Sequence, residues 1–143
     1  MGSRWLFMIA GILFLVLVVL LWTSHVLSPV ATSSVPVEVG VAGEVGIKLD
    51  KDKMYFGTVP AGNVARRPVV VSVPEDSFVV LKPGGDIAEW LEPKRNGFEL
   101  EGGTNTSVMV RAEVPAATED GMYSGELSVV AYRPAARLFL GGE

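Results

Sequence analysis

An unbroken apolar run near the amino terminus constrains this chain more than any other feature. From Trp5 to Trp22 it reads WLFMIAGILFLVLVVLLW, with no charged residue and no proline. As an α-helix, this run is about 27 Å long, close to the ~30 Å hydrocarbon core of a bilayer. A helix that is apolar on every side is too hydrophobic for the surface of one small domain. We therefore predict a membrane-spanning helix over residues 5–23, preceded by a short tip of residues 1–4.

The residues at the two ends of the run predict how it is oriented. Trp5 and Trp22 bracket it, and indole rings prefer the headgroup level of a membrane. Arg4 is the only charged side chain before Glu38. Because positive charge is retained on the cytoplasmic side, the tip is expected in the cytoplasm and the rest of the chain outside it. Arg4, Trp5 and Trp22 are thus the expected membrane-interface residues, with membrane lipids as their partner.

Two other interpretations of the run remain open. A cleaved secretory signal has a shorter apolar region of about 7–15 residues, followed directly by a small-x-small cleavage site. Here the best such pair, Ala31 and Ser33, lies well past Trp22, which favours an uncleaved anchor. A pilin-type leader is compatible with the short basic segment Met1–Arg4, although no acidic residue follows near the start of the helix. All three interpretations place the remaining chain outside the cytoplasm.

A polar segment separates the apolar run from the rest of the chain. Residues 24–36 are rich in serine, carry Pro29 and Pro36, and have no formal charge. This composition is typical of an extended linker, so we predict a stalk that lifts the domain off the membrane. His25, at its start, has no neighbouring carboxylate that would orient it as a base, and we expect a solvated side chain.

Beyond Pro36, short segments rich in valine, isoleucine and aromatic residues alternate with glycine, proline and asparagine turns. This pattern predicts an antiparallel β-sandwich over residues 37–143, because no long helical period is present. Only Ile87–Glu92 has the composition of a helical turn. The expected strands are Val37–Val41, Val45–Leu49, Met54–Phe56, Arg66–Val73, Phe78–Leu81, Phe98–Glu101, Ser107–Val114, Gly125–Tyr132 and Arg137–Leu140.

Alternation within the later strands predicts which side chains are buried. In Ser107–Val114, valines and an alanine occupy every second position, so that one face is buried and the other solvated. In Gly125–Tyr132, Leu127 and Ala131 are expected inward and Val130 outward. Gly125 is expected to permit a bulge or a close approach of two backbones. The expected large core residues are Trp90, Phe56, Phe78 and Phe98.

Two motifs resemble the Ig-like domains of bacteria and archaea. Residues 54–63, MYFGTVPAGN, are similar to the opening of these domains, and residues 115–129, PAATEDGMYSGELSV, are similar to their last hairpin. The resemblance covers about Val45 to Tyr132 and implies an Ig-like sandwich of a prokaryotic, in particular archaeal, surface protein. Such domains serve as spacers, adhesion modules and assembly subunits. In outline, an apolar helix carrying one sandwich is also similar to stator proteins of the archaeal motility filament.

Composition argues against most chemistry. The chain has no cysteine and one histidine, so thiolate and multi-histidine metal sites are excluded. The acidic pairs Asp50/Asp52, Glu75/Asp76, Glu99/Glu101 and Glu119/Asp120 match no calcium loop and are expected to be solvated. Without Arg4 the chain keeps 11 basic against 16 acidic residues, which disfavours nucleic-acid binding. We therefore predict a protein that is not an enzyme and needs no cofactor.

Two further segments are candidate sites. Asn105-Thr106-Ser107 is an N-glycosylation sequon on a glycine-rich loop. The C-terminal residues Leu138, Phe139 and Leu140 are expected either to close the sandwich as an edge strand or to pair with the sheet edge of another subunit or partner. Val37–Val41 could pair in the same way. Together these features predict a single-pass, membrane-anchored binding or scaffold protein of an envelope complex, with a protein partner or a homo-oligomer; the alternative is a pilin-like filament subunit.

Overall fold

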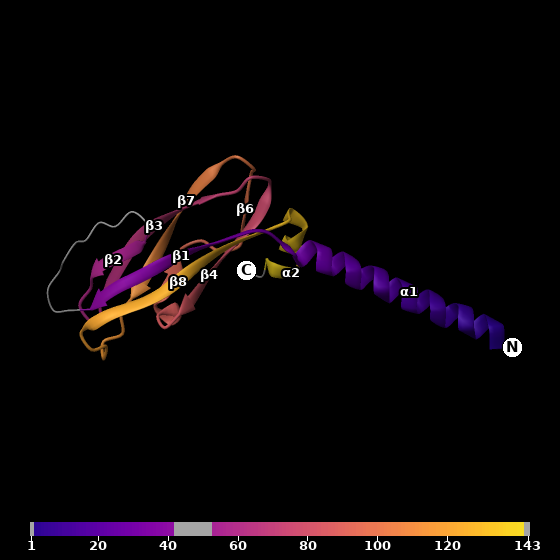
Figure 1. The fold of residues 1–143 in the computed structure, drawn as a ribbon, viewed down its shortest axis with the longest axis horizontal. Coiled ribbons are helices and arrows are strands. Elements are labelled where there is room, and N and C mark those ends of the chain that lie inside the picture. The colour runs from indigo at the N-terminus through magenta and orange to yellow at the C-terminus, as the bar shows by residue number, and fades with distance from the viewer. Residues whose placement is uncertain (1, 42–52, 142–143) are drawn as a thin grey trace.

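A long helix projects from a β-sandwich (Figure 1). The computed structural model describes residues 2–41 and 53–141. Helix α1 covers Gly2–Leu27, and in the described residues it is the one helix long and apolar enough to cross a membrane. No part of its apolar window is buried against the sandwich. This helix therefore confirms the expected helical span by length and composition, and extends it at both ends.

The remaining elements are strands and short helical turns. Two 3₁₀ turns occur, η1 (Ala88–Trp90) and η2 (Pro134–Ala136), and a four-residue helix, α2 (Arg137–Leu140), ends the described chain. The turn expected within Ile87–Glu92 is thus present as η1. The strands are β1 (Pro29–Val41), β2 (Met54–Thr58), β3 (Val64–Ser72), β4 (Ser77–Gly85), β5 (Leu91–Pro93), β6 (Phe98–Leu100), β7 (Asn105–Glu113) and β8 (Gly121–Tyr132).

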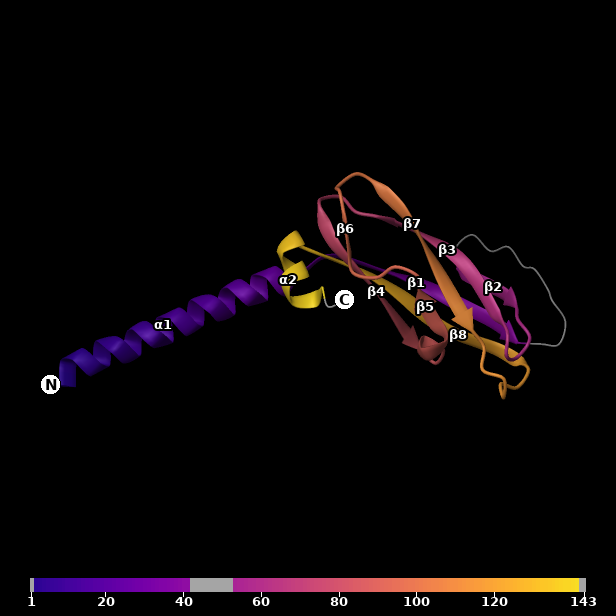
Figure 2. The ribbon, with the colours of Figure 1, turned by 180° about the vertical axis from the view of Figure 1, so that it is seen from behind.

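The strands form two sheets, which face each other as in a sandwich (Figure 2). The larger sheet has the order β2-β1-β8-β4-β6, and the smaller has the order β3-β7-β5. The larger sheet is curled like half of a barrel. Pairing is antiparallel except between β1 and β2, which are parallel. The prediction of a two-sheet, mostly β architecture is confirmed, whereas the purely antiparallel arrangement was wrong at this one pair.

The core lies between the two sheets and contains the side chains that alternation predicted. In β7 and just after it, Val108, Val110, Ala112 and Val114 are buried, while the intervening side chains lie toward solvent. Phe56 and Phe98 belong to this core as expected, whereas Phe78, although buried, is not part of it and lies on the outer face of the larger sheet, opposite Tyr132. Trp90 is half-buried and packs against this core with its ring centroid 4.9 Å from that of Tyr123, which matches a packing role.

The segment predicted as a stalk is part of the sandwich. Helix α1 continues to Leu27, and Pro29–Pro36 forms the first half of β1. Its residues pair with β8 from Pro29 opposite Tyr132 to Pro36 opposite Glu126. Ser28 alone separates helix from strand. The polar composition was misleading because the side chains here are mostly exposed while the backbone satisfies its hydrogen bonds in the sheet.

The C-terminal prediction of a strand was also wrong. Arg137–Leu140 is helical, and the chain reaches it through η2, which has a proline in its first turn. Proline is favoured at such a position because its fixed φ suits the start of a helix. Leu138, Phe139 and Leu140 therefore offer no strand for pairing in this conformation. The strand expected at Val45–Leu49 lies outside the described residues, as does the acidic pair Asp50/Asp52.

Strand β8 shows one confirmed expectation and one correction. A Cβ at Gly125 would lie 2.7 Å from both the Gly84 carbonyl oxygen and the Ile87 Cγ1, which is the close backbone approach predicted for it. Val130, expected outward, is buried. Its side chain lies on the outer face of the sheet but is covered by the end of α1 and by the C-terminal segment.

Candidate functional site

The end of helix α1 is packed onto the sandwich. Val26 is 4% exposed and forms a small cluster with Val130, Tyr132 and Ala136, with Val80 packed against it. This cluster is separate from the main core and lies on the outer face of the larger sheet, where β8, β4 and η2 meet α1. Packing on this scale restricts rotation of the helix relative to the sheet. We call these residues the junction cluster.

Polar contacts add to the junction cluster. The guanidinium of Arg133 donates a hydrogen bond to the carbonyl oxygen of His25 over 2.9 Å. That carbonyl is among the last four of α1, which have no partner within the helix. The Lys82 ammonium donates to the Tyr132 hydroxyl over 3.2 Å. The helix end is thus capped by a side chain from the C-terminal segment.

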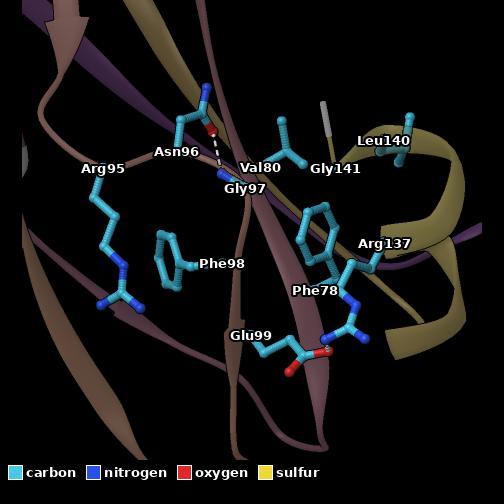
Figure 3. Close-up of a pocket in the computed structure, with 10 residues that line it drawn as sticks. All are labelled: Phe78, Val80, Arg95, Asn96, Gly97, Phe98, Glu99, Arg137, Leu140 and Gly141. Carbon is cyan, nitrogen blue, oxygen red and sulfur yellow. Dashed lines mark hydrogen bonds and ion pairs between the residues drawn. The ribbon is translucent and has the colours of Figure 1, made fainter. Parts of the chain in front are cut away.

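An open cleft of about 880 Å³ lies beside the junction cluster (Figure 3). It is bounded by β4, by the loop that leads into β6, and by α2. Figure 3 shows Arg95 alongside the Phe98 ring and Arg137 reaching Glu99. Its lining residues are Phe78, Val80, Arg95, Asn96, Gly97, Phe98, Glu99, Arg137, Leu140 and Gly141.

The loop wall of the cleft is fixed by the side chain of Asn96. Its Oδ1 accepts hydrogen bonds from the Leu81 N–H at 2.8 Å and from the Gly97 N–H at 2.9 Å, and its Nδ2 donates to the Leu81 carbonyl at 3.0 Å. Strand pairing between β4 and β6 ends at Val79 opposite Phe98. The Asn96 amide therefore continues the hydrogen bonding of the ladder beyond the last paired strand residue.

Charged groups of the cleft are already engaged with neighbours. The Arg95 guanidinium lies 4.6 Å from the centroid of the Phe98 ring, a cation–π contact. Arg137 Nη1 and Glu99 Oε1 are 3.1 Å apart, and both side chains are largely exposed. Among the lining residues, Glu99 is the one carboxylate, and it is held in this ion pair. The cleft thus combines apolar surface with polar side chains that already have partners within the chain.

A second polar surface lies on the outer face of the smaller sheet. Arg111 Nη2 contacts Glu113 Oε2 at 2.7 Å, and Arg111 Nη1 lies 3.7 Å from Glu92 Oε2. Exposed ion pairs of this kind contribute little to stability. We interpret this network as a solvated face of the sheet.

The acidic pairs, which were expected to be solvated, include carboxylates with partners of their own in the described residues. There, no group of three or more histidine, aspartate or glutamate side chains could hold a metal ion. Asp76 instead accepts a hydrogen bond from the Gly102 N–H at 2.8 Å. Glu99 pairs with Arg137, as above. These carboxylates have structural partners that single-sequence spacing did not reveal.

No family model, curated protein or solved structure matches this chain. Its function therefore has to be argued from its own residues.

The residues predicted for the membrane interface all belong to α1. Arg4 and Trp5 lie in its first turns, exposed, and Trp22 lies in its last turns. The Trp22 ring makes an edge contact with Phe139, with centroids 6.2 Å apart. The sequence does not predict this contact, because the two residues are far apart in the chain. Asn105 is exposed at the start of β7, opposite Ser72 of β3.

The site residues that sequence analysis missed are Val26, Arg133 and Asn96. Val26 was assigned to the stalk, although it continues the apolar pattern of the helix. Asn96 and Gly97 lie in the loop before β6, and a side-chain hydrogen bond to another strand has no sequence signal. Arg133 precedes Pro134. It can cap α1 only because the C-terminal segment folds back beside the end of that helix.

Proposed function

We propose that this chain is a single-pass membrane protein whose amino terminus is cytoplasmic and whose extracytoplasmic, Ig-like β-sandwich binds or scaffolds a protein partner in the cell envelope. The observation that carries this proposal is the junction. An apolar, exposed α1 passes through Ser28 directly into β1, and the junction cluster packs the two together. A helix held in a bilayer would thereby present the sandwich at a fixed position above the membrane.

The unpaired side of β1 supports a binding role. Residues Pro29–Pro36 pair with β8 on one side, and within the described residues the other side of this half-strand has no partner strand. An open edge next to a membrane is a template for an extended segment of a partner. By contrast, the free edge of β3 carries Pro68 in mid-strand, which removes an N–H and disfavours addition of a strand.

A binding role also agrees with the cleft. Its groups are charged, amide and aromatic, and the carboxylate is held in an ion pair. We propose no catalytic step, cofactor or nucleic-acid partner. The Ig-like assignment rests on the two motifs in the sequence and on the two-sheet arrangement that contains them.

The experiment that tests this proposal has two parts. Protease added to intact cells should digest the sandwich if it is extracytoplasmic, and detergent should be required to extract the chain. A photo-crosslinking residue at Ser33, on the open side of β1, should then yield one discrete adduct with a different protein. The matched control is Val70, which is 70% exposed on β3 of the other sheet and should give no discrete adduct.

A pilin-like filament subunit is the second candidate, and one observation favours it. Without a stalk, α1 and the sandwich form a continuous rod, and the apolar side chains of α1 are exposed all round. Such a helix can pack against copies of itself as well as against lipid. In that case the Ser33 variant should give a ladder of adducts of the chain with itself, and fibres should be visible by electron microscopy.

The outcomes separate the two candidates. A hetero-adduct supports the accessory protein, and a self-ladder with fibres supports the filament subunit. A sandwich that resists protease in intact cells, or a chain that stays in solution without lipid or detergent, would overturn both.

A further inference from the structure

The C-terminal segment folds back onto the end of helix α1. Ala136 of η2 is buried in the junction cluster with Val26. One turn later, the Phe139 ring meets the Trp22 ring at an interplanar angle of 65°. Helix α2 therefore lies beside the last turns of α1, and Figure 1 shows it at the foot of the sandwich, where α1 emerges.

Helix α2 exposes a compact apolar surface. Leu138 is 74% exposed, Phe139 48% and Leu140 39%. Consecutive large apolar side chains in water are unfavourable, because their apolar surface is not removed from solvent. The surface of α2 is continuous through Phe139 and Trp22 with the exposed apolar surface of α1.

The position of Trp22 fixes the depth of α2. If Trp5 and Trp22 occupy the two headgroup layers, about 26 Å of helix lies between them, which suits the hydrocarbon core. A side chain in ring contact with Trp22 then lies at the same interface. Arg137, at the start of α2, pairs with Glu99 on the side of the sandwich, so the charged and apolar parts of α2 are segregated.

We propose that α2 is a second membrane contact: Leu138 and Phe139 lie in the lipid headgroup layer on the sandwich side of the bilayer that α1 crosses. This inference rests on the proposed membrane anchoring of α1. This contact fixes the orientation of the sandwich relative to the membrane. It also holds the open edge of β1 at a fixed height above the lipid surface.

A lipid surface suits α2 better than a second copy of the chain. A stable protein interface takes about 20–30 residues from each partner, whereas α2 presents three apolar side chains. Short apolar segments beside a membrane helix need no such area, because the helix already supplies the attachment. The continuity with α1 through Trp22 therefore points to lipid.

The absence of cysteine allows a direct test. Single variants Leu138→Cys, Leu13→Cys and Met122→Cys of the full chain are labelled with an environment-sensitive fluorophore and reconstituted in phosphatidylcholine vesicles. Leu13 lies in mid-helix and Met122 is 66% exposed on β8, at the far end of the sandwich. Each is then quenched with nitroxide-labelled lipid and with aqueous iodide.

The expected result is a graded pattern. The probe at 138 should show blue-shifted emission, quenching by nitroxide placed near the headgroup, and severalfold weaker iodide quenching than the probe at 122. The probe at 13 should be quenched by deeply placed nitroxide, and the probe at 122 by iodide alone.

Other patterns overturn the inference and separate it from the anchoring. If the probe at 138 behaves like that at 122 while the probe at 13 is in lipid, the second contact is wrong and the anchor stands. If the probe at 138 is shielded from both quenchers, protein covers α2 and the lipid contact is wrong. If the probe at 13 is quenched by iodide, the proposed anchoring itself fails, and the inference fails with it.

Discussion

The guanidinium of Arg133 and the carbonyl oxygen of His25 are joined by a hydrogen bond of 2.9 Å between residues 108 positions apart. The bond links the residue that follows the last strand, β8, to the last turn of α1. Carbonyl groups at a helix end otherwise depend on water or on a cap. Together with the junction cluster, this contact holds the end of the helix against the sandwich.

Replacing Arg133 by methionine should loosen the helix end. The variant keeps an unbranched side chain but removes the donor, at a cost of about 1 kcal/mol for a partly solvated bond. Hydrogen exchange in detergent should speed up in peptides covering residues 23–30. Arg66→Met, on exposed β3, is the matched control and should leave this exchange unchanged. Equal exchange in both variants would show that the cap does not restrain the helix.

Gly125 should not tolerate a side chain. A Cβ there would meet the Gly84 carbonyl oxygen at 2.7 Å, and Gly85, opposite in the ladder, has a φ of 80°. The Gly84 carbonyl is part of the backbone and cannot move aside as the end of a flexible side chain can. Gly125→Ala should therefore destabilise the sandwich by about 1–3 kcal/mol. Thermal unfolding followed by circular dichroism measures the loss.

Gly121→Ala is the control for this strand. The nearest atom to its added Cβ is Tyr123 Cε2, at an ordinary 3.7 Å. Its unfolding temperature should stay unchanged or rise slightly, because alanine restricts the unfolded chain. A Gly125→Ala variant as stable as Gly121→Ala would refute the close approach of β4 and β8.

The sequence predicted the elements whose pattern is set by burial. In β7, one face lies against the core, so apolar residues such as Val108 and Val110 alternate with polar ones along the sequence. The span of α1 was equally evident, because an apolar run of that length has few alternatives. Predictions failed where the order of apolar and polar residues does not reflect burial. Pro29–Pro36 pairs through its backbone while exposing polar side chains, and this leaves no periodic signal.

The candidate site was less predictable than the fold. Val130 sits at an outward position of β8, and only the return of α1 and η2 over the sheet buries it. The apolar residues of Arg137–Leu140 have a strand-like composition, yet tertiary contact with Trp22 and the turn at Pro134 give a helix. Such contacts join distant parts of the chain, and local propensity carries no information on them.

Asn96 should contribute to stability as if it were a strand residue. Its amide bonds both the N–H and the carbonyl of Leu81, which is 1% exposed. Asn96→Ala leaves these two backbone groups without partners, at a cost of about 1–3 kcal/mol. Urea unfolding should shift to a lower midpoint with an unchanged slope. Asn63→Ala, at an exposed turn, should leave the midpoint unchanged, and equal midpoints for both variants would contradict the role of Asn96.

Val26 provides the most direct test of the junction cluster. Truncation of this side chain to alanine removes about two methylene equivalents from contact with Ala136 and Tyr132, a loss of about 1–2 kcal/mol. Because Ala136 belongs to η2, hydrogen exchange should rise by about tenfold in peptides covering residues 133–141.

Val19→Ala is the matched control for Val26, since Val19 lies on the same helix with 52% of its surface exposed. Its truncation should leave exchange in residues 133–141 unaltered. If Val26→Ala also leaves it unaltered, α1 does not pack on the sandwich in solution. The sandwich would then swing freely on Ser28, and both the fixed height of the β1 edge and the placement of α2 at the lipid surface would lose their physical basis.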